Sequence, residues 1–222
     1  MKKLLLIITF CTTLYITAFA QDFKVDQGRF IQETQRTSNE NHIFKIVWWI
    51  PVDFWPIVLS QSPNVTKEQM DNIVSLLKDY NLVAIVDGKL SELGEVQYVD
   101  VAELRNSIFL KDNSGVIYKP LSDDEINSGT KTLIETMKPV LSNMMGKMGQ
   151  NMQFFVFPIA GKDKVLIADP KKQGLLTIGL SNDTYKFKLP LEALLKPKKC
   201  PIDNEEMAGS WLYCPWHGVK LE

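Results

Sequence analysis

The sequence predicts an α+β protein with a mixed, largely antiparallel sheet and two main helices. Short segments rich in β-branched and aromatic residues alternate with turn residues, as strands do. Two other segments carry complete helix-start signals. The elements follow the order strand, helix, strands, helix and then a series of hairpins, which favours an antiparallel sheet over a parallel doubly wound one. We also expect a small separate knuckle over residues 199–222.

Residues 1–20 have the features of a secretory signal peptide. Lys2 and Lys3 form a basic start, residues 4–14 are mostly apolar, and Ala18-Phe19-Ala20 is a small-x-small cleavage site. The apolar run is too short and too rich in threonine for a comfortable membrane span, although an uncleaved anchor is the alternative. We therefore expect an exported bacterial protein, periplasmic or secreted, with no transmembrane segment after cleavage.

The mature chain is expected to begin with a loose polar arm over residues 21–41, followed by the α+β domain over residues 42–198. Residues 42–50, with the sequence HIFKIVWWI, form the strongest strand signal. Alternation along a strand places apolar residues on both of its faces, which is typical of a central strand covered on both sides.

The two helix starts share one device. Thr66 and Gln69 can cap each other in a capping box, and Ser122 and Glu125 repeat this arrangement. The second helix is expected to begin at this box and to bend or break near Pro139. The remaining strands are expected over residues 82–86, 108–110, 116–118, 154–157, 165–168, 175–178 and 185–188, with a turn at residues 87–88.

Sequence motifs of enzymes are scarce. The chain has only two histidines and three cysteines, and it lacks a Gly-x-Ser-x-Gly motif, a phosphate-binding loop and a dinucleotide fingerprint. We therefore name no catalytic residue, and we lean towards a protein that is not an enzyme. Only three arginines occur, Arg29, Arg36 and Arg105, which argues against a nucleic-acid partner.

Two clusters are candidates for a binding surface. Trp48, Trp49 and Trp55 lie close together in the sequence, and such aromatic residues either fill an apolar groove or form a core nucleus. Met144 and Met148 belong to a methionine-rich segment, and thioethers suit Cu(I) as well as soft packing. Both interpretations of each cluster stay open at this stage.

The C-terminal residues contain two Cys-Pro turns, Cys200-Pro201 and Cys214-Pro215. They resemble the short zinc ribbon found at the ends of many bacterial proteins, which has two Cys-Pro-x-Cys-Gly turns and a final leucine. The match also covers Gly209, Tyr213, Gly218 and Leu221. Asp203 and His217 stand where the family has its second and fourth cysteines, and Asn204 replaces one turn glycine.

The resemblance implies one of two structures. Cys200, Asp203, Cys214 and His217 can form a tetrahedral zinc site, since zinc accepts sulfur, nitrogen and carboxylate ligands. Alternatively, Cys200 and Cys214 form a disulfide, which an oxidising compartment favours. Either arrangement would close the module.

The sequence thus predicts an exported, non-enzymatic binding or assembly protein with a stabilised C-terminal module. Its expected partner is another protein or a small apolar ligand. The second hypothesis is an extracytoplasmic copper- or zinc-handling protein that uses Met144 and Met148 together with Cys214 and His217.

Overall fold

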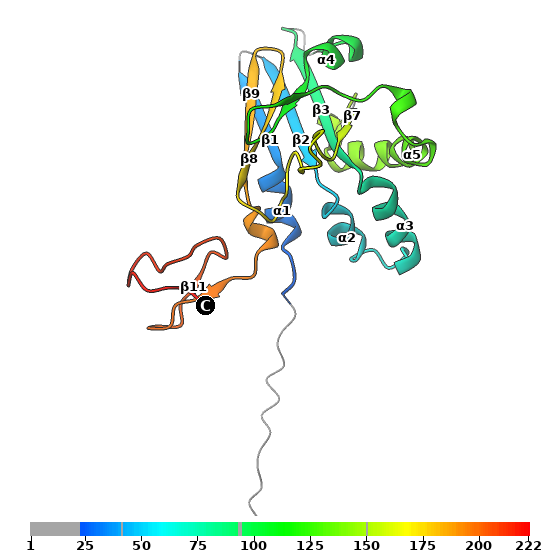
Figure 1. Cartoon of the computed structure of the whole chain (residues 1–222). Helices are drawn as coiled ribbons and strands as arrows, with labels where there is room; N and C mark the ends of the chain where they lie inside the picture. Colours follow the sequence, from blue (N-terminus) through cyan, green and yellow to red (C-terminus); the bar gives the residue numbers. More distant parts are fainter. Residues whose placement is uncertain (1–22, 41, 93–94, 150) are drawn as a thin grey trace, which may run out of the picture.

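The computed structural model describes residues 23–40, 42–92, 95–149 and 151–222. The predicted signal peptide lies outside this part of the chain. The fold is α+β, as predicted, with helices, antiparallel sheets and short 3-10 turns (Figure 1). Among the described residues, no helix is long and apolar enough to cross a membrane.

Two larger sheets form the body of the molecule. In the first, β1 (Gln35–Glu40), β2 (Ile43–Ile50) and β3 (Tyr80–Leu90) are neighbours, and β4 (Val96–Tyr98) and β7 (Gln153–Pro158) both pair with β3. The second has the order β6 (Ile117–Tyr118), β5 (Phe109–Lys111), β8 (Gly174–Leu180) and β9 (Asp183–Leu189). All of these pairings are antiparallel.

The helices are α1 (Gln27–Thr34), α2 (Phe54–Leu59), α3 (Lys67–Leu77), α4 (Val101–Ser107) and α5 (Ser128–Met144). Short 3-10 turns are η1 (Asp123–Glu125), η2 (Gly146–Gly149) and η3 (Glu192–Leu194). A two-stranded sheet of β10 (Lys198–Lys199) and β11 (Glu206–Met207) begins the C-terminal module.

The first sheet lies between helices and the second sheet because β2 and β3 are apolar on both faces. On one face, Trp48 contacts Phe54 of α2 edge to face, with ring centroids 5.2 Å apart. On the other face, Trp49 contacts Phe187 of β9 at 6.2 Å. The prediction that residues 42–50 form a central strand covered on both sides is therefore confirmed.

The prediction of a loose arm over residues 21–41 is wrong for residues 23–40, the part of this segment that the structure describes. This segment forms α1 and the edge strand β1, and β1 pairs with β2 along its whole length. Phe30 and Thr34 are fully buried, and Thr34 Oγ1 accepts a hydrogen bond from Trp48 Nε1. Most polar residues of this segment lie on exposed or half-buried positions of an amphipathic helix and an edge strand, while Thr34 is buried. The α+β domain therefore starts before residue 42.

The two helix starts have different outcomes. α3 begins with the predicted capping box, in which Gln69 N donates to Thr66 Oγ1 and Thr66 N donates to Gln69 Oε1. The second box, Ser122 with Glu125, starts only the 3-10 turn η1. The long helix α5 begins later because Asn127 caps it, and it continues through Pro139 to Met144.

The strand predictions also need two corrections. β3 does not turn at residues 87–88 but runs on to Leu90. Gly88 sits where a Cβ atom would lie 2.7 Å from the ring of Phe44, so this glycine allows close packing rather than a turn. Residues 165–168 form no strand beyond a single bridge between Ala160 and Leu166. The predicted hairpin at residues 108–118 is present as β5 and β6.

Candidate metal centre

The C-terminal module contains two turns with one hydrogen-bond pattern. In each turn, the cysteine amide donates to the carbonyl of the residue five positions later. The residue four positions later donates its own amide to the cysteine carbonyl, and all four bonds measure 2.8–3.0 Å. These bonds join Cys200 with Glu205 and Asn204, and Cys214 with Val219 and Gly218. The two halves of the module are therefore equivalent in backbone geometry.

Each turn needs a left-handed residue at its fourth position after the cysteine. Asn204 has a φ of 60° and Gly218 has a φ of 65°. Glycine adopts this conformation freely, and asparagine is among the few other residues that reach it at low cost. The replacement of one turn glycine by Asn204 thus preserves the turn.

The equivalent turns bring three ligand side chains together. The ligand atoms of Cys200, Cys214 and His217 all lie within 4.8 Å of one another. His217 Nδ1 is 3.4 Å from Cys200 Sγ and 3.5 Å from Cys214 Sγ. These three residues could hold a metal ion.

Asp203 lies beside this group. Its Oδ2 atom is 3.6 Å from His217 Nδ1, while its Oδ1 atom accepts the amide of Glu205 at 3.0 Å. The backbone bond fixes the orientation of the carboxylate and leaves Oδ2 facing the histidine. The fourth predicted ligand therefore lies beside His217, although it is not one of the three residues whose ligand atoms all lie within 4.8 Å of one another.

The same distances argue against a catalytic triad of cysteine, histidine and aspartate. In a triad, the nucleophile and the carboxylate contact opposite nitrogens of the imidazole ring. Here both thiols and the carboxylate lie closest to the same nitrogen, Nδ1 of His217. The ligand atoms of Cys200, Cys214 and His217 instead lie within 4.8 Å of one another, as side chains that share one metal ion can.

The environment acts differently on the two thiols. Burial raises the pKa of Cys200, and its contacts with Asp203 and Cys214 add to this rise. Burial acts in the same direction on Cys214, but hydrogen bonds from the amides of His217 and Trp216 outweigh it and lower the pKa of that thiol. The amide of Glu205 lowers the pKa of Asp203. Backbone amides that point at sulfur stabilise the thiolate form, which is the form that binds metals.

The module has only a small apolar core of its own. Its buried apolar side chains are those of Cys200, Met207, Cys214 and Leu221, with Val219 packed against them. Gly209 touches the chain that joins the module to the domain, since a Cβ atom there would lie 2.5 Å from the carbonyl oxygen of Lys196. Gly209 and Leu221, both part of the resemblance, therefore have packing roles.

The predicted disulfide is not formed in the structure, where Cys200 and Cys214 are free thiols. Their sulfur atoms are nevertheless neighbours within the ligand group. Pairing of the two cysteines under oxidising conditions stays a prediction.

Of the two interpretations of the aromatic cluster, the binding surface is wrong and the core nucleus is correct. Trp48, Trp49 and Trp55 are between 0% and 2% exposed. Trp48 and Trp55 lie in the layer between sheet and helices, and Trp49 lies between the two sheets. These indoles form the core because β2 is covered on both faces, which leaves them no access to a ligand.

The methionine-rich segment does not join the C-terminal site. Met144 is exposed at the end of α5. Figure 1 shows α5 on the far side of the molecule from the module that carries Cys214 and His217. The side chain of Met148 lies outside what the structure describes. The structure therefore does not bring Met144 together with the C-terminal ligands.

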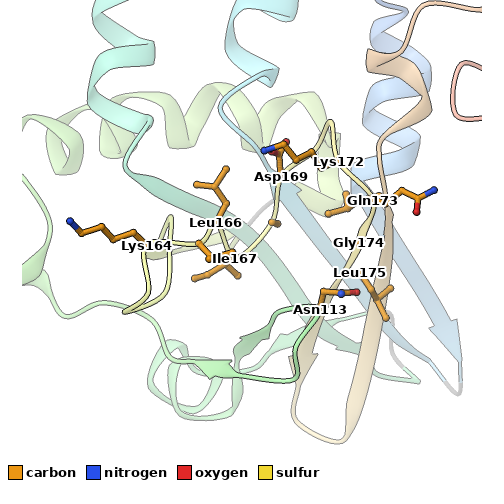
Figure 2. Close-up of a pocket in the computed structure, with 12 residues that line it drawn as sticks. Asn113, Lys164, Leu166, Ile167, Asp169, Lys172, Gln173, Gly174 and Leu175 are labelled. Carbon is orange, nitrogen blue, oxygen red and sulfur yellow. The ribbon is translucent and has the colours of Figure 1, made fainter.

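The surface also has a hollow beside β8. It has a volume of about 480 Å³ and is lined by residues such as Lys164, Leu166, Asp169 and Lys172 (Figure 2). Asp169 is already engaged, because it accepts the amide of Lys171 and pairs with Lys172 at 3.1 Å. The hollow thus lacks a free buried polar group that would orient a ligand.

The exposed apolar residues of the module were not predicted from the sequence. Ile202, Trp211, Leu212, Tyr213 and Trp216 are 45–73% exposed. Two of them, Ile202 and Trp216, are the variable residues of the Cys-Pro-x turns. Their place in the motif, beside residues that must bind metal, was a signal that these side chains point outwards.

Comparisons with protein-family models, with curated proteins and with solved structures found no match to this chain.

Proposed function

We propose that this chain is an exported binding protein whose C-terminal module is organised by one zinc ion. Cys200, Asp203, Cys214 and His217 would hold the ion, and the module would present its exposed side chains to a partner. The observation that carries the proposal is the convergence of both thiols and the carboxylate on His217 Nδ1.

The distances fit a zinc ion. Tetrahedral zinc with sulfur at about 2.3 Å and nitrogen or oxygen at about 2.0 Å holds its ligand atoms roughly 3.3–3.8 Å apart. The three distances to His217 Nδ1, at 3.4, 3.5 and 3.6 Å, fall in this range. Two thiolates, an imidazole and a carboxylate form a donor set that zinc accepts.

The small core supports a structural role for the metal. A module with four buried apolar side chains cannot bury enough apolar surface to fold on that basis alone. A structural zinc site contributes on the order of 10 kcal/mol to folding, which would supply the missing stability. Four protein ligands also leave no open coordination position for a substrate, so we propose binding rather than catalysis.

The test uses the chain from Gln21 onwards, purified without reductant or chelator. We expect one equivalent of zinc by elemental analysis and two thiols that become reactive only after the metal is removed. Replacement of zinc by cobalt should give the absorption bands of a tetrahedral, thiolate-ligated ion.

Two conservative variants separate the zinc site from the disulfide. Asp203→Asn keeps the side-chain oxygen that accepts the amide of Glu205 but removes the charged ligand, and His217→Asn removes the ring nitrogen. Both should lose zinc under mild chelation, whereas His42→Asn, at the exposed left-handed residue before β2, should keep it. A protein with neither metal nor free thiols would contradict the proposal and establish the disulfide. Two free thiols without metal would contradict both.

A further inference from the structure

Cys200 and Cys214 are the only cysteines that follow the predicted signal peptide in the sequence. Both are free thiols, and their sulfur atoms lie within 4.8 Å of each other. Each thiol therefore has a single candidate partner within the chain from Gln21. Two thiols at this distance can share a metal ion, and they can also be oxidised to a disulfide.

The fold of the module holds the two cysteines side by side through main-chain hydrogen bonds. Glu222 exchanges two such bonds with Lys199, the residue before Cys200, at 3.0 and 3.3 Å. Val219, three residues before Glu222, accepts the amide of Cys214 at 2.8 Å. The last residues of the chain thus join the backbone beside one cysteine to the backbone of the other.

From a zinc site, a disulfide needs only a small movement of the sulfur atoms. Two thiolates on one tetrahedral zinc ion are about 3.8 Å apart, since each Zn–S bond is about 2.3 Å long. An S–S bond is about 2.05 Å long. The sulfurs would therefore approach each other by about 1.7 Å, a distance that side-chain rotation covers.

The metal and the disulfide exclude each other at this site. Zinc binds the thiolate form of cysteine, and a disulfide sulfur does not carry that negative charge. After pairing, Asp203 and His217 would be the remaining ligands, and their side chains are 37% and 32% exposed. Two partly exposed ligands hold an ion weakly against water, so formation of the disulfide would release the zinc.

The segment between the cysteines carries contacts that attach the module to the rest of the chain. Within residues 201–213, Ser210 N donates to Glu192 of η3 at 3.2 Å. The carbonyl of Trp211 accepts a hydrogen bond from Lys198 Nζ, before the first turn, at 2.7 Å. A disulfide closes this same segment into a loop and restricts its unfolded conformations. The oxidised module should therefore stay folded and attached without metal.

We propose that the module is a redox switch, in which a peroxide converts the zinc-bound thiolates of Cys200 and Cys214 into a disulfide and releases the ion. One thiolate breaks the O–O bond, takes one oxygen as a sulfenic acid and sets free a hydroxide. The other thiolate attacks that sulfur, forms the S–S bond and expels a second hydroxide. The two sulfurs together lose the two electrons that the peroxide gains. This inference rests on the proposed function, because the switch starts from the zinc-loaded module.

The experiment adds hydrogen peroxide to the zinc-loaded chain from Gln21 in the presence of a chromogenic zinc indicator. We expect release of one zinc ion per chain, in step with the loss of both thiols. Peptide mass analysis without reductant should find Cys200 linked to Cys214 of the same chain. Dithiothreitol followed by added zinc should restore both the thiols and the bound metal.

Variants separate pairing of the thiols from general oxidation. His217→Asn keeps both cysteines but not the metal, so peroxide should give the same disulfide with no release of zinc. Cys214→Ala leaves Cys200 without its partner, so excess peroxide should carry this thiol to a sulfinic acid that dithiothreitol cannot reduce. His42→Asn, outside the module, should respond as the unaltered chain does.

Hydrogen exchange distinguishes the closed states of the module from the open one. The amides of Asn204 and Gly218, which are bonded within the two turns, should be protected in the zinc-loaded and in the oxidised chain. They should lose protection in the reduced chain after a chelator has removed the zinc. The amide of Val83, in the core strand β3, should stay protected in all three states.

The outcomes separate the switch from the zinc site. Zinc that stays bound in peroxide, thiols that end as sulfinic acids, or disulfides that link two chains would each overturn the switch and leave the zinc site intact. A purified chain without zinc would instead reject the proposed function itself.

Discussion

Asn204 and Gly218 occupy the same position in the two turns of the metal centre, with φ angles of 60° and 65°. Their equivalence shows that the turns need a left-handed residue and do not need glycine itself. The side chain of Asn204 is tolerated because asparagine reaches this conformation at low cost.

This relationship predicts how the turns respond to substitution. Gly218→Asn should leave stability and metal content nearly unchanged, because no atom lies within 4 Å of the position of a new Cβ atom. Gly218→Val should destabilise the module by about 1–2 kcal/mol through backbone strain alone. Chelator competition for zinc measures the effect, and equal affinities of the two variants would show that the left-handed conformation is not required.

Trp49 is a core residue, and we predict that the hydrogen bond from its Nε1 atom also contributes to stability. Its Nε1 atom donates to Asn81 Oδ1 at 3.2 Å, and Asn81 Nδ2 donates to the carbonyl of Pro158. Trp49→Phe would leave Asn81 Oδ1 buried without this donor and would create a cavity, which together should cost about 2–4 kcal/mol. Trp216→Phe, at an exposed position, should cost under about 0.5 kcal/mol. Urea unfolding followed by circular dichroism compares them, and similar costs would contradict the assignment of Trp49 to the core.

Lys45 and Asp87 are predicted to make stability depend on pH. Burial raises the pKa of Asp87, and Lys45, 3.5 Å away, opposes this rise. Because its pKa is raised in the folded state, Asp87 contributes most to the stability of the fold below its ordinary pKa of 3.8. This contribution is lost as the pH increases through the folded-state pKa. At pH 7 the buried carboxylate of Asp87 is charged, and the nearby ammonium group of Lys45 compensates that charge.

Lys45→Met should consequently destabilise the protein by roughly 3 kcal/mol at pH 7, because a buried carboxylate loses its cation. The cost should shrink near pH 4, where Asp87 can take up a proton. Lys89→Met serves as the control, since Lys89 is exposed on β3, the strand that carries Asp87. The stability of this variant should change little at either pH. The measurement is urea unfolding at both pH values, and a cost for Lys45→Met that does not vary with pH would refute the role of Asp87.

Gly179 is predicted to be required for contact between β5 and β8. A Cβ atom at this position would lie 2.1 Å from the ring of Phe109, its cross-strand partner. Gly179→Ala should therefore cost about 1–3 kcal/mol, since the ring has to move out of a packed region. Gly174→Ala on the same strand meets its nearest atom at 3.8 Å and should be nearly neutral. Thermal unfolding of the two variants decides the point.

The sequence was most informative where local chemistry and burial agree. The strand over residues 43–50 and the helix start at Thr66 could be predicted because apolar patterning and capping indicate the same structure. α1 and β1 could not, since only a few of their side chains are buried and their polar positions resemble a loop. The Asp87-Gly88 pair looked like a turn because its tertiary partners, Lys45 and Phe44, are distant in the sequence.

The candidate site shows a similar division. Motif spacing was sufficient to bring together Cys200, Cys214 and His217, because each turn is local and the repeat sets their geometry. The exposure of Trp216 and the burial of Trp48 could not be predicted from residue type. Both are indoles, and their surroundings distinguish them: Trp48 lies in β2, which is covered on both faces, and Trp216 lies in a Cys-Pro-x turn.

The 3-10 turn η3 links the two parts of the molecule through two glutamates, one in α1 and one in η3 itself. Glu33 of α1 accepts the amide of Ala193 within η3, and Glu192 of η3 accepts the amide of Ser210 in the module. Two hydrogen bonds at η3 thus fix the module to the domain, so that the connection is not a flexible linker. A mechanical force applied to the C-terminal end should therefore reach α1 through η3. From α1 it should reach the core, because Thr34 of that helix accepts a hydrogen bond from the indole of Trp48.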